Sequence, residues 1–218
     1  METRIYAGLR VGTEMNHGLN GSVLAVHRRW GASPSREFPP STNLFLQGNP
    51  PSEVFYIERG MVKLICLSEN GQESAIGLQS QGDLLGAASV IVQKPYPVTA
   101  VTVTRCALSR IPADLFLSLA KTDEQFCWYI HKVHSLEIHR QADQLAALRY
   151  LSARQRFERL LLQFLSSIPE HEKQTSMKIR LPLRRWEIAQ LIGVRPEHLS
   201  RVFNGSNKKA YCMRKMAV

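Results

Sequence analysis

The stretch Arg184–Phe203, RRWEIAQLIGVRPEHLSRVF, carries the clearest structural pattern in the chain. Its apolar residues fall in two clusters with spacings of three and four, which is the pattern of one helix face. Gly193 lies where the first helix would end. Pro196 lies where a second helix could begin, since proline is tolerated in a first helical turn. Two short helices joined by a tight turn that contains glycine predict a helix-turn-helix.

The second of these helices would bury Leu199 and Val202 and present a polar face to solvent. The polar residues are Glu197, His198, Ser200 and Arg201. An exposed arginine can bind a guanine edge with two hydrogen bonds, and a carboxylate can accept one from cytosine N4. The pattern therefore indicates DNA binding, with an ordinary helical hairpin on a core as the alternative interpretation.

The chain has 218 residues and a net charge of +10, and the whole excess lies in its last third. Residues 149–218 hold 15 Lys and Arg against 5 Asp and Glu, whereas residues 1–148 hold 13 of each kind. A charge that only improved solubility would not be segregated in this way. The segregation favours contact with DNA phosphates.

Upstream, residues 38–111 show short strand patterns separated by turns. The predicted strands are Val54–Ile57, Met61–Leu67, Ser74–Leu78 and Val98–Leu108. Asn70-Gly71 is the preferred pair for a tight hairpin turn, in which both central residues need positive φ. Short strands at this spacing predict an all-β barrel or sandwich. We place this domain at residues 22–113, with a short helix at Ser22–Trp30 and a loose leader at residues 1–21.

Residues 114–150 contain neither proline nor glycine and predict one long helix. Four apolar residues follow the spacing of a coiled-coil seam: Phe126, Tyr129, Val133 and Leu136. Further along, the same register meets Arg140 and Asp143, so the seam is imperfect. A helix that only packs on the β domain is the alternative. Ser152-x-x-Gln155 is a capping box that begins the last domain, residues 151–218. Met177–Leu181 could form a short strand before the helix-turn-helix.

Three stretches resemble the cyclic-AMP receptor protein / fumarate-nitrate regulator (CRP/FNR) family of bacterial transcription factors. They are residues 187–193 with Glu197, Ser200 and Arg201, then Phe55–Leu64, then Gln81–Gly86. The resemblance covers about residues 38–203 and implies an α+β fold. Its parts are a cyclic-nucleotide-binding-like jelly roll, a long dimerisation helix and a winged helix-turn-helix.

This resemblance implies a homodimer that reads a palindrome of TTGAT-like half-sites about one helical turn apart, with RNA polymerase as a further partner. The residues that would read bases are Glu197, Ser200 and Arg201. Phosphate contacts are expected from four other basic residues: Lys178, Arg184, Arg185 and Arg195. After Phe203 the chain reads NGSNKKAYCMRKMAV, which lacks the strand alternation of the family's wing. We expect an incomplete wing there.

The family's cyclic-AMP binders carry a Glu after the glycine of the phosphate segment and an Arg-Ser pair shortly after it. Here Ala87 follows Gly86, and Lys94–Thr99 contains no Arg, so cyclic AMP binding is not expected. The effector would be a different small molecule. The predicted pocket consists of Leu84, Gly86, Ala87, Ser89, Tyr96 and Thr99.

Neither a cofactor nor an enzymatic activity is expected. The four cysteines are at least 21 residues apart, unlike the close ligands of iron–sulfur and zinc sites. No histidine lies between Arg28 and Ile130, which disfavours haem. Cys66 and Cys106 fit core packing better than redox chemistry. The sequence shows no P-loop and no nucleophile–base motif.

The sequence thus predicts an allosteric, dimeric DNA-binding regulator. No stretch is long and apolar enough for a membrane span or a signal peptide, so a cytoplasmic location is expected. The alternative is a dimeric sensor module whose altered C-terminus impairs specific DNA binding.

Overall fold

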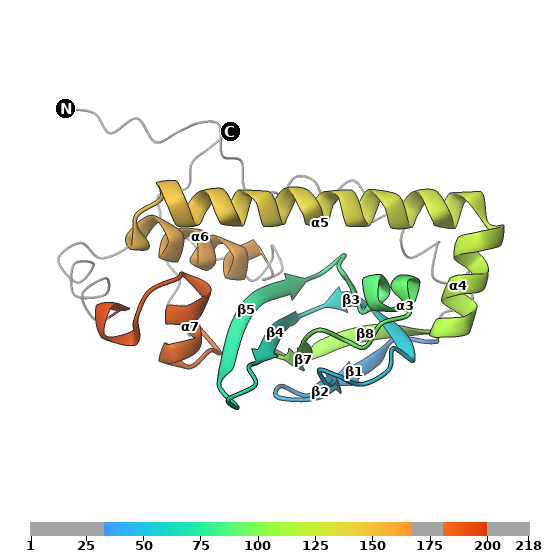
Figure 1. Cartoon of the computed structure of the whole chain (residues 1–218), viewed down its shortest axis with the longest axis horizontal. Coiled ribbons are helices and arrows are strands. Elements are labelled where there is room, and N and C mark those ends of the chain that lie inside the picture. Colours follow the sequence, from blue (N-terminus) through green and yellow to red (C-terminus); the bar gives the residue numbers. More distant parts are fainter. Residues whose placement is uncertain (1–32, 167–180, 200–218) are drawn as a thin grey trace.

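The computed structural model describes residues 33–166 and 181–199 of the chain. A β domain lies beneath a long helix that runs along the whole molecule, and shorter helices lie toward both ends (Figure 1). Two antiparallel sheets of four strands form the β domain, in the orders β1-β8-β3-β6 and β2-β7-β4-β5. The predicted α+β class and the jelly roll are confirmed.

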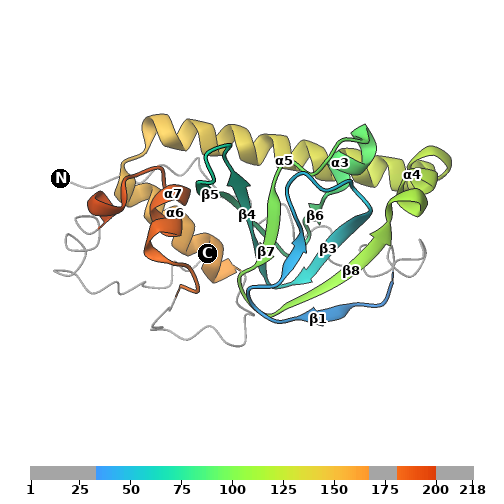
Figure 2. The same ribbon diagram turned by 60° about the horizontal axis from the view of Figure 1, so that its bottom comes forward.

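The strands of the first sheet are β1 (Arg36–Phe38), β8 (Cys106–Pro112), β3 (Glu53–Arg59) and β6 (Leu84–Leu85). Those of the second are β2 (Asn43–Phe45), β7 (Thr99–Thr102), β4 (Met61–Leu67) and β5 (Glu73–Ser80). Figure 2 shows how the two sheets curve around a common interior. That interior is filled by seven buried side chains: Phe55, Ile57, Val62, Leu85, Ala100, Cys106 and Leu108.

The β4–β5 hairpin is present, but the prediction for its turn was wrong. Residues 68–72 connect the strands, and the Ser68 N–H donates to the Gln72 carbonyl at 3.0 Å. Gly71 has φ +75°, whereas Asn70 does not have positive φ. A two-residue turn would need positive φ at both positions. The longer connection removes that requirement.

Two further boundary predictions need correction. Val98–Leu108 was predicted as one strand, but residues 103–105 separate β7 from β8, and these two strands lie in different sheets. The long helical segment is also divided, into α4 (Ala113–Thr122) and α5 (Glu124–Tyr150). Asp123 adopts an extended conformation, and its side chain accepts a hydrogen bond from the Phe126 N–H at 3.0 Å. Asp123 is therefore an N-cap, which starts a new helix.

After α5 the chain turns back along it through α6 (Ala153–Ser166). The predicted capping box is confirmed, since the Ser152 N–H donates to Gln155 Oε1 at 2.9 Å and the Gln155 N–H donates to Ser152 Oγ at 3.3 Å. The short helix α3 (Ala87–Val92) lies beside β3, and α7 (Arg185–Leu191) lies beside β5. None of the described helices combines the length and apolar character needed to cross a membrane.

Some predictions fall outside the described residues. These are the leader, the helix at Ser22–Trp30, most of the strand at Met177–Leu181, and everything after Leu199.

Candidate DNA-binding site and its supports

The first helix of the helix-turn-helix is α7, and its N-terminus is fixed by its own glutamate. Glu187 Oε2 accepts a hydrogen bond from the Arg184 backbone N–H at 2.6 Å. At the other end Gly193 has φ +64°, a conformation that glycine adopts without a steric penalty. The Val194 N–H then donates to the Ala189 carbonyl at 2.9 Å, which closes the turn. The predicted turn at Gly193 is confirmed.

The second helix begins at Pro196, as predicted, and is described as far as Leu199. Leu199 is completely buried, while Glu197 and His198 are exposed. Among the predicted phosphate contacts, Arg184 and Arg195 are also exposed. Arg185 lies at the exposed start of α7. The remaining predicted contacts, namely Lys178, Ser200 and Arg201, lie outside the described residues.

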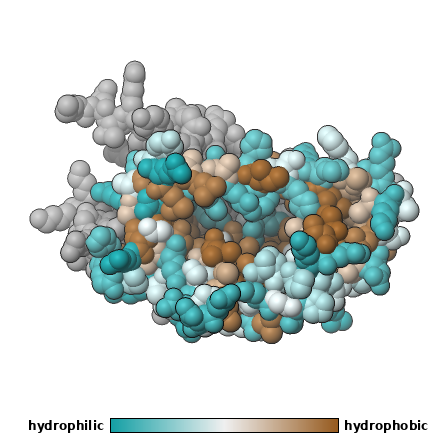
Figure 3. Space-filling view, in the orientation of Figure 1, coloured by the Kyte–Doolittle hydropathy of each residue, from teal (hydrophilic) through white to brown (hydrophobic). Residues whose placement is uncertain are grey.

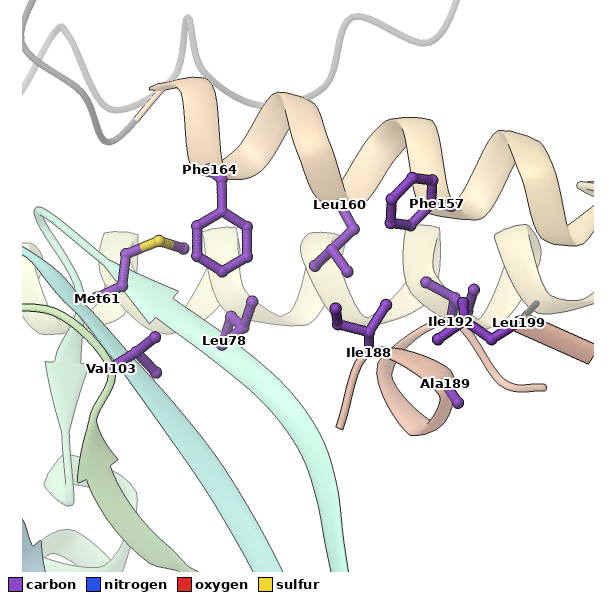
Figure 4. Packing of buried hydrophobic residues seen from close by; sticks show 10 residues of the cluster. All are labelled: Met61, Leu78, Val103, Phe157, Leu160, Phe164, Ile188, Ala189, Ile192 and Leu199. Atoms are coloured by element: carbon purple, nitrogen blue, oxygen red, sulfur yellow. The ribbon is translucent and has the colours of Figure 1, made fainter. Parts of the chain in front are cut away.

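The helix-turn-helix packs on α6 and on the jelly roll through one apolar cluster (Figure 4). Its buried members are Met61, Leu78, Val103, Phe157, Leu160, Phe164, Ile188, Ala189, Ile192 and Leu199. The first three come from the jelly roll, and the last four come from the helix-turn-helix. The two domains therefore share a core. Sequence spacing predicted that Leu199 is buried, but it could not show what Leu199 packs against.

The predicted coiled-coil seam faces the chain's own jelly roll. Phe126 is 1% exposed and makes an edge-to-face contact with Phe116, with ring centroids 5.2 Å apart. Val133 is also buried, and Tyr129 and Leu136 pack around Tyr56. These four side chains pack within one chain, so the residues named for an intermolecular seam were wrong, whereas pairing of the long helix with a second copy stays a prediction.

The opposite face of α5 carries a second heptad pattern. Trp128, Ile138 and Leu145 are 72%, 66% and 66% exposed, respectively. Together with the exposed residues His131, Ser135 and Ala142, they follow a spacing of three and four along one helix face. Figure 3 shows hydrophobic residues among hydrophilic ones along the upper part of the molecule, where Figure 1 places α5. We call this set the outer face of α5.

The apolar register of the inner face is interrupted by Arg140 because that residue binds a buried carboxylate. Arg140 donates to Asp83 Oδ1 and Oδ2 at 3.1 and 3.0 Å, and to Gln79 at 2.6 Å. Burial raises the pKa of the Asp83 carboxyl, and this effect outweighs the opposing attraction of Arg140. Sequence reasoning missed this pair, although a basic residue in an apolar register was its signal.

The six residues of the predicted effector pocket lie in different surroundings. Ala87 is buried in the cluster that contains Phe116 and Phe126, and Leu84 packs against the same cluster. Ser89 is buried in α3. Alternation along β6 directs Leu85 into the interior of the jelly roll and Leu84 toward the helices, and the role of both regions in effector binding stays a prediction.

Gly86 and Tyr96 lie side by side. Tyr96 is 3% exposed, and its ring stacks on Phe45 with centroids 4.0 Å apart. Its hydroxyl donates to the Glu53 carbonyl at 2.7 Å. A Cβ on Gly86 would lie 2.8 Å from Tyr96 Cε1, so glycine is required for this contact. Thr99 lies at the start of β7, where its hydroxyl accepts from the Gln47 N–H at 3.0 Å.

The thiols of the jelly roll behave as structural groups. Cys106 is fully buried, and its Sγ donates to the Met61 carbonyl at 3.3 Å. Burial raises the pKa of this thiol, which disfavours the reactive thiolate. Cys66 is half-buried in β4. Within the described residues, no group of three or more His, Cys, Asp and Glu side chains is placed to hold a metal ion.

A jelly roll joined by a long helix to a helix-turn-helix defines a class of proteins in which a sensory domain is coupled to a DNA-binding domain. Two family descriptions match this chain in that order. Residues 35–123 match the cyclic nucleotide-binding domain, and residues 155–209 match the Crp-like helix-turn-helix domain. The second match extends past Phe203, beyond the stretch in which the resemblance was expected to end.

Among curated proteins, the chain is 26% identical over 168 residues to the transcriptional activator protein FnrA of Stutzerimonas stutzeri, covering 77% of this chain and 68% of FnrA. It is 26% identical over 160 residues to the transcriptional activator protein anr of Pseudomonas aeruginosa, covering 73% of this chain and 65% of that protein. The chain thus spans about two thirds of the length of these relatives.

Among solved structures, FixK2 from Bradyrhizobium japonicum has the same fold, with a TM-score of 0.66 at 17% identity. The alignment covers 82% of this chain and 85% of FixK2. The two domain matches and their order show that the chain belongs to the CRP/FNR family of transcription regulators. This family is a class of regulators and not of enzymes.

Proposed function

We propose that the chain is a homodimeric regulator that reads palindromic DNA in the cytoplasm through the second helix of its helix-turn-helix. One observation carries the proposal: the helix that starts at Pro196 buries Leu199 and exposes Glu197 and His198. A recognition helix uses its N-terminal residues to contact base edges in the major groove. We also propose that the chain contacts RNA polymerase, because it belongs to a family of transcription regulators.

Dimerisation is assigned to the outer face of α5. A helix of 27 residues that packs on its own domain by one face retains a second face for a partner. Ile138 and Leu145 are seven residues apart and occupy the same heptad position. Trp128 occupies the other core position of this heptad pattern. In a dimer joined along this face, a two-fold axis would relate the two helix-turn-helix units. A palindromic DNA site has the same two-fold symmetry.

Effector control would reach α5 from the jelly roll through the pair of Asp83 and Arg140. Asp83 lies in the turn before β6, close to the predicted effector pocket, and Arg140 lies in the middle of α5. Ligand binding that favours one arrangement of this turn would favour one arrangement of the helix pair. Tyr96 and Gly86 lie at the segment where the effector would act.

Glu197→Ala tests the base-reading role. We expect the variant to lose about 1–3 kcal/mol on the preferred palindrome and to relax the preference at one base position of each half-site. The measurement is fluorescence anisotropy on a set of palindromes that differ at single symmetric positions. Glu69→Ala is the matched control, because it removes one exposed carboxylate from the β4–β5 hairpin without touching the reading helix. Equal weakening on every duplex would contradict base reading by Glu197.

A further inference from the structure

The first helix of the helix-turn-helix is attached to the jelly roll at the free edge of a sheet. Among the described strands, β5 is the last of its sheet, so one side of its backbone faces away from β4. Gln190 of α7 covers this side with its amide group. Gln190 Oε1 accepts from the Ala75 N–H at 2.7 Å, and Nε2 donates to the Glu73 carbonyl at 3.1 Å. Unpaired strand edges need such a cover.

A buried charge pair lies beside this amide bridge. Lys63 of β4 donates to Glu187 of α7, which is 2% exposed. The Lys63 side chain is 18% exposed. An ion pair in such surroundings adds little net stability, because desolvation of the charges offsets their attraction. It does restrict the geometry, since any displacement of α7 would leave a buried carboxylate without its partner.

The docked arrangement leaves the described part of the proposed reading surface, Glu197 and His198, exposed. Met61, Leu78 and Phe164 belong to the apolar cluster that joins the two domains (Figure 4), while Glu197 and His198 stay exposed. The contact therefore sets the position of the helix-turn-helix and leaves the start of its second helix accessible. We call Lys63, Glu187, Gln190 and the backbone groups of Glu73 and Ala75 the clasp.

We propose that the clasp holds each helix-turn-helix at a fixed orientation on its own jelly roll, and that Lys63 and Gln190 are positioning residues for binding of two half-sites. The inference rests on the proposed function. When the first half-site is bound, the second binds at an effective concentration set by the geometry of the link. A rigid clasp maintains the separation of the two reading helices, and a loose one lowers that effective concentration.

Lys63→Ala separates positioning from a general loss of affinity. We expect the affinity for a full palindrome to fall about tenfold or more, because effective-concentration effects commonly reach that size. The affinity for a duplex with a single half-site should be unchanged. Lys121→Ala on α4 is the matched control, because it removes one exposed lysine that belongs to neither the clasp nor the helix-turn-helix. Lys63→Arg keeps the charge and should restore most of the binding.

Amide hydrogen exchange tests the clasp in solution without DNA. The Ala75 N–H has Gln190 as its partner, so it should be protected in the wild-type chain. It should exchange faster in Gln190→Ala and Lys63→Ala, while amides between β4 and β5 keep their protection. An unprotected Ala75 amide in the wild-type chain would overturn the clasp. With the amide protected, equal losses on both duplexes or tighter binding by Lys63→Ala would overturn the positioning role.

These two measurements also separate the clasp from the proposed function. If the wild-type chain bound a palindrome and a scrambled duplex equally well, that result would contradict specific DNA reading. It would contradict the positioning role of the clasp as well. Protection of the Ala75 amide would still report whether α7 docks on β5.

Discussion

The double variant Ile138→Glu with Leu145→Glu is expected to be monomeric and to bind the palindrome about 100-fold more weakly, or worse. Both side chains are 66% exposed in the single chain, so their replacement removes little from its core. In a paired helix they would occupy seam positions, where two copies would bring four carboxylates together without partners. Loss of the dimer removes the benefit of binding two half-sites at once, which can exceed a factor of 100.

Analytical ultracentrifugation measures the mass, and anisotropy on full and single half-sites measures the binding. Ile91→Glu with Val92→Glu is the matched control, because it places two carboxylates at exposed apolar positions on α3. The control should stay dimeric and bind as the wild type does. A double α5 variant that remains dimeric would show that the outer face of α5 is not the interface.

Phe126→Ala, on the inner face of the same helix, is expected to destabilise the fold by about 3–5 kcal/mol. Phe126 is 1% exposed and packs against Phe116, so truncation leaves a cavity between α4 and α5. The measurement is chemical denaturation at a protein concentration well below the dimer dissociation constant, so that association does not contribute to the unfolding free energy. Phe126→Leu should lose less and provides a folded variant if the alanine variant does not fold.

Trp128→Ala is the comparison for this experiment. It lies two residues away on the outer face, is 72% exposed, and should change the unfolding free energy of one chain by no more than about 0.5 kcal/mol. The dimer dissociation constant should show the reverse order of effects. Trp128→Ala should raise it strongly, whereas Phe126→Leu should change it little. Similar unfolding losses for Phe126→Ala and Trp128→Ala would contradict the division of α5 into two faces.

This division shows what could and could not be predicted from the sequence. Spacings of three and four identify a helix face, but they do not say whether the face meets the same chain or a second one. Phe126 and Ile138 both belong to heptad patterns, and only the packed structure assigns the first to the jelly roll. Arg140 was the available signal, because its charge in an apolar register indicated a buried partner within the chain.

Local chemistry predicted some boundaries correctly and missed others. Gly193, Pro196 and the box of Ser152 with Gln155 were found because special backbone conformations and caps have residue-specific signatures. The break at Asp123 has such a signature too, since aspartate is a preferred N-cap, but the surrounding helical pattern concealed it. The clasp had no local signature, because Lys63 and Gln190 are distant in the sequence and meet only when the two domains pack together.

The most direct test of the account is the binding of the full chain to a labelled TTGAT–ATCAA palindrome and to a scrambled duplex of equal length, across a salt series. Proteins that read specific sites prefer them by about 10³-fold or more, and we predict such a preference for this chain. It should persist as salt weakens binding to both duplexes. Equal and steeply salt-dependent binding to both would mean that the basic C-terminal third only contacts phosphates. That result would contradict sequence-specific regulation by this chain and leave a dimeric sensory module.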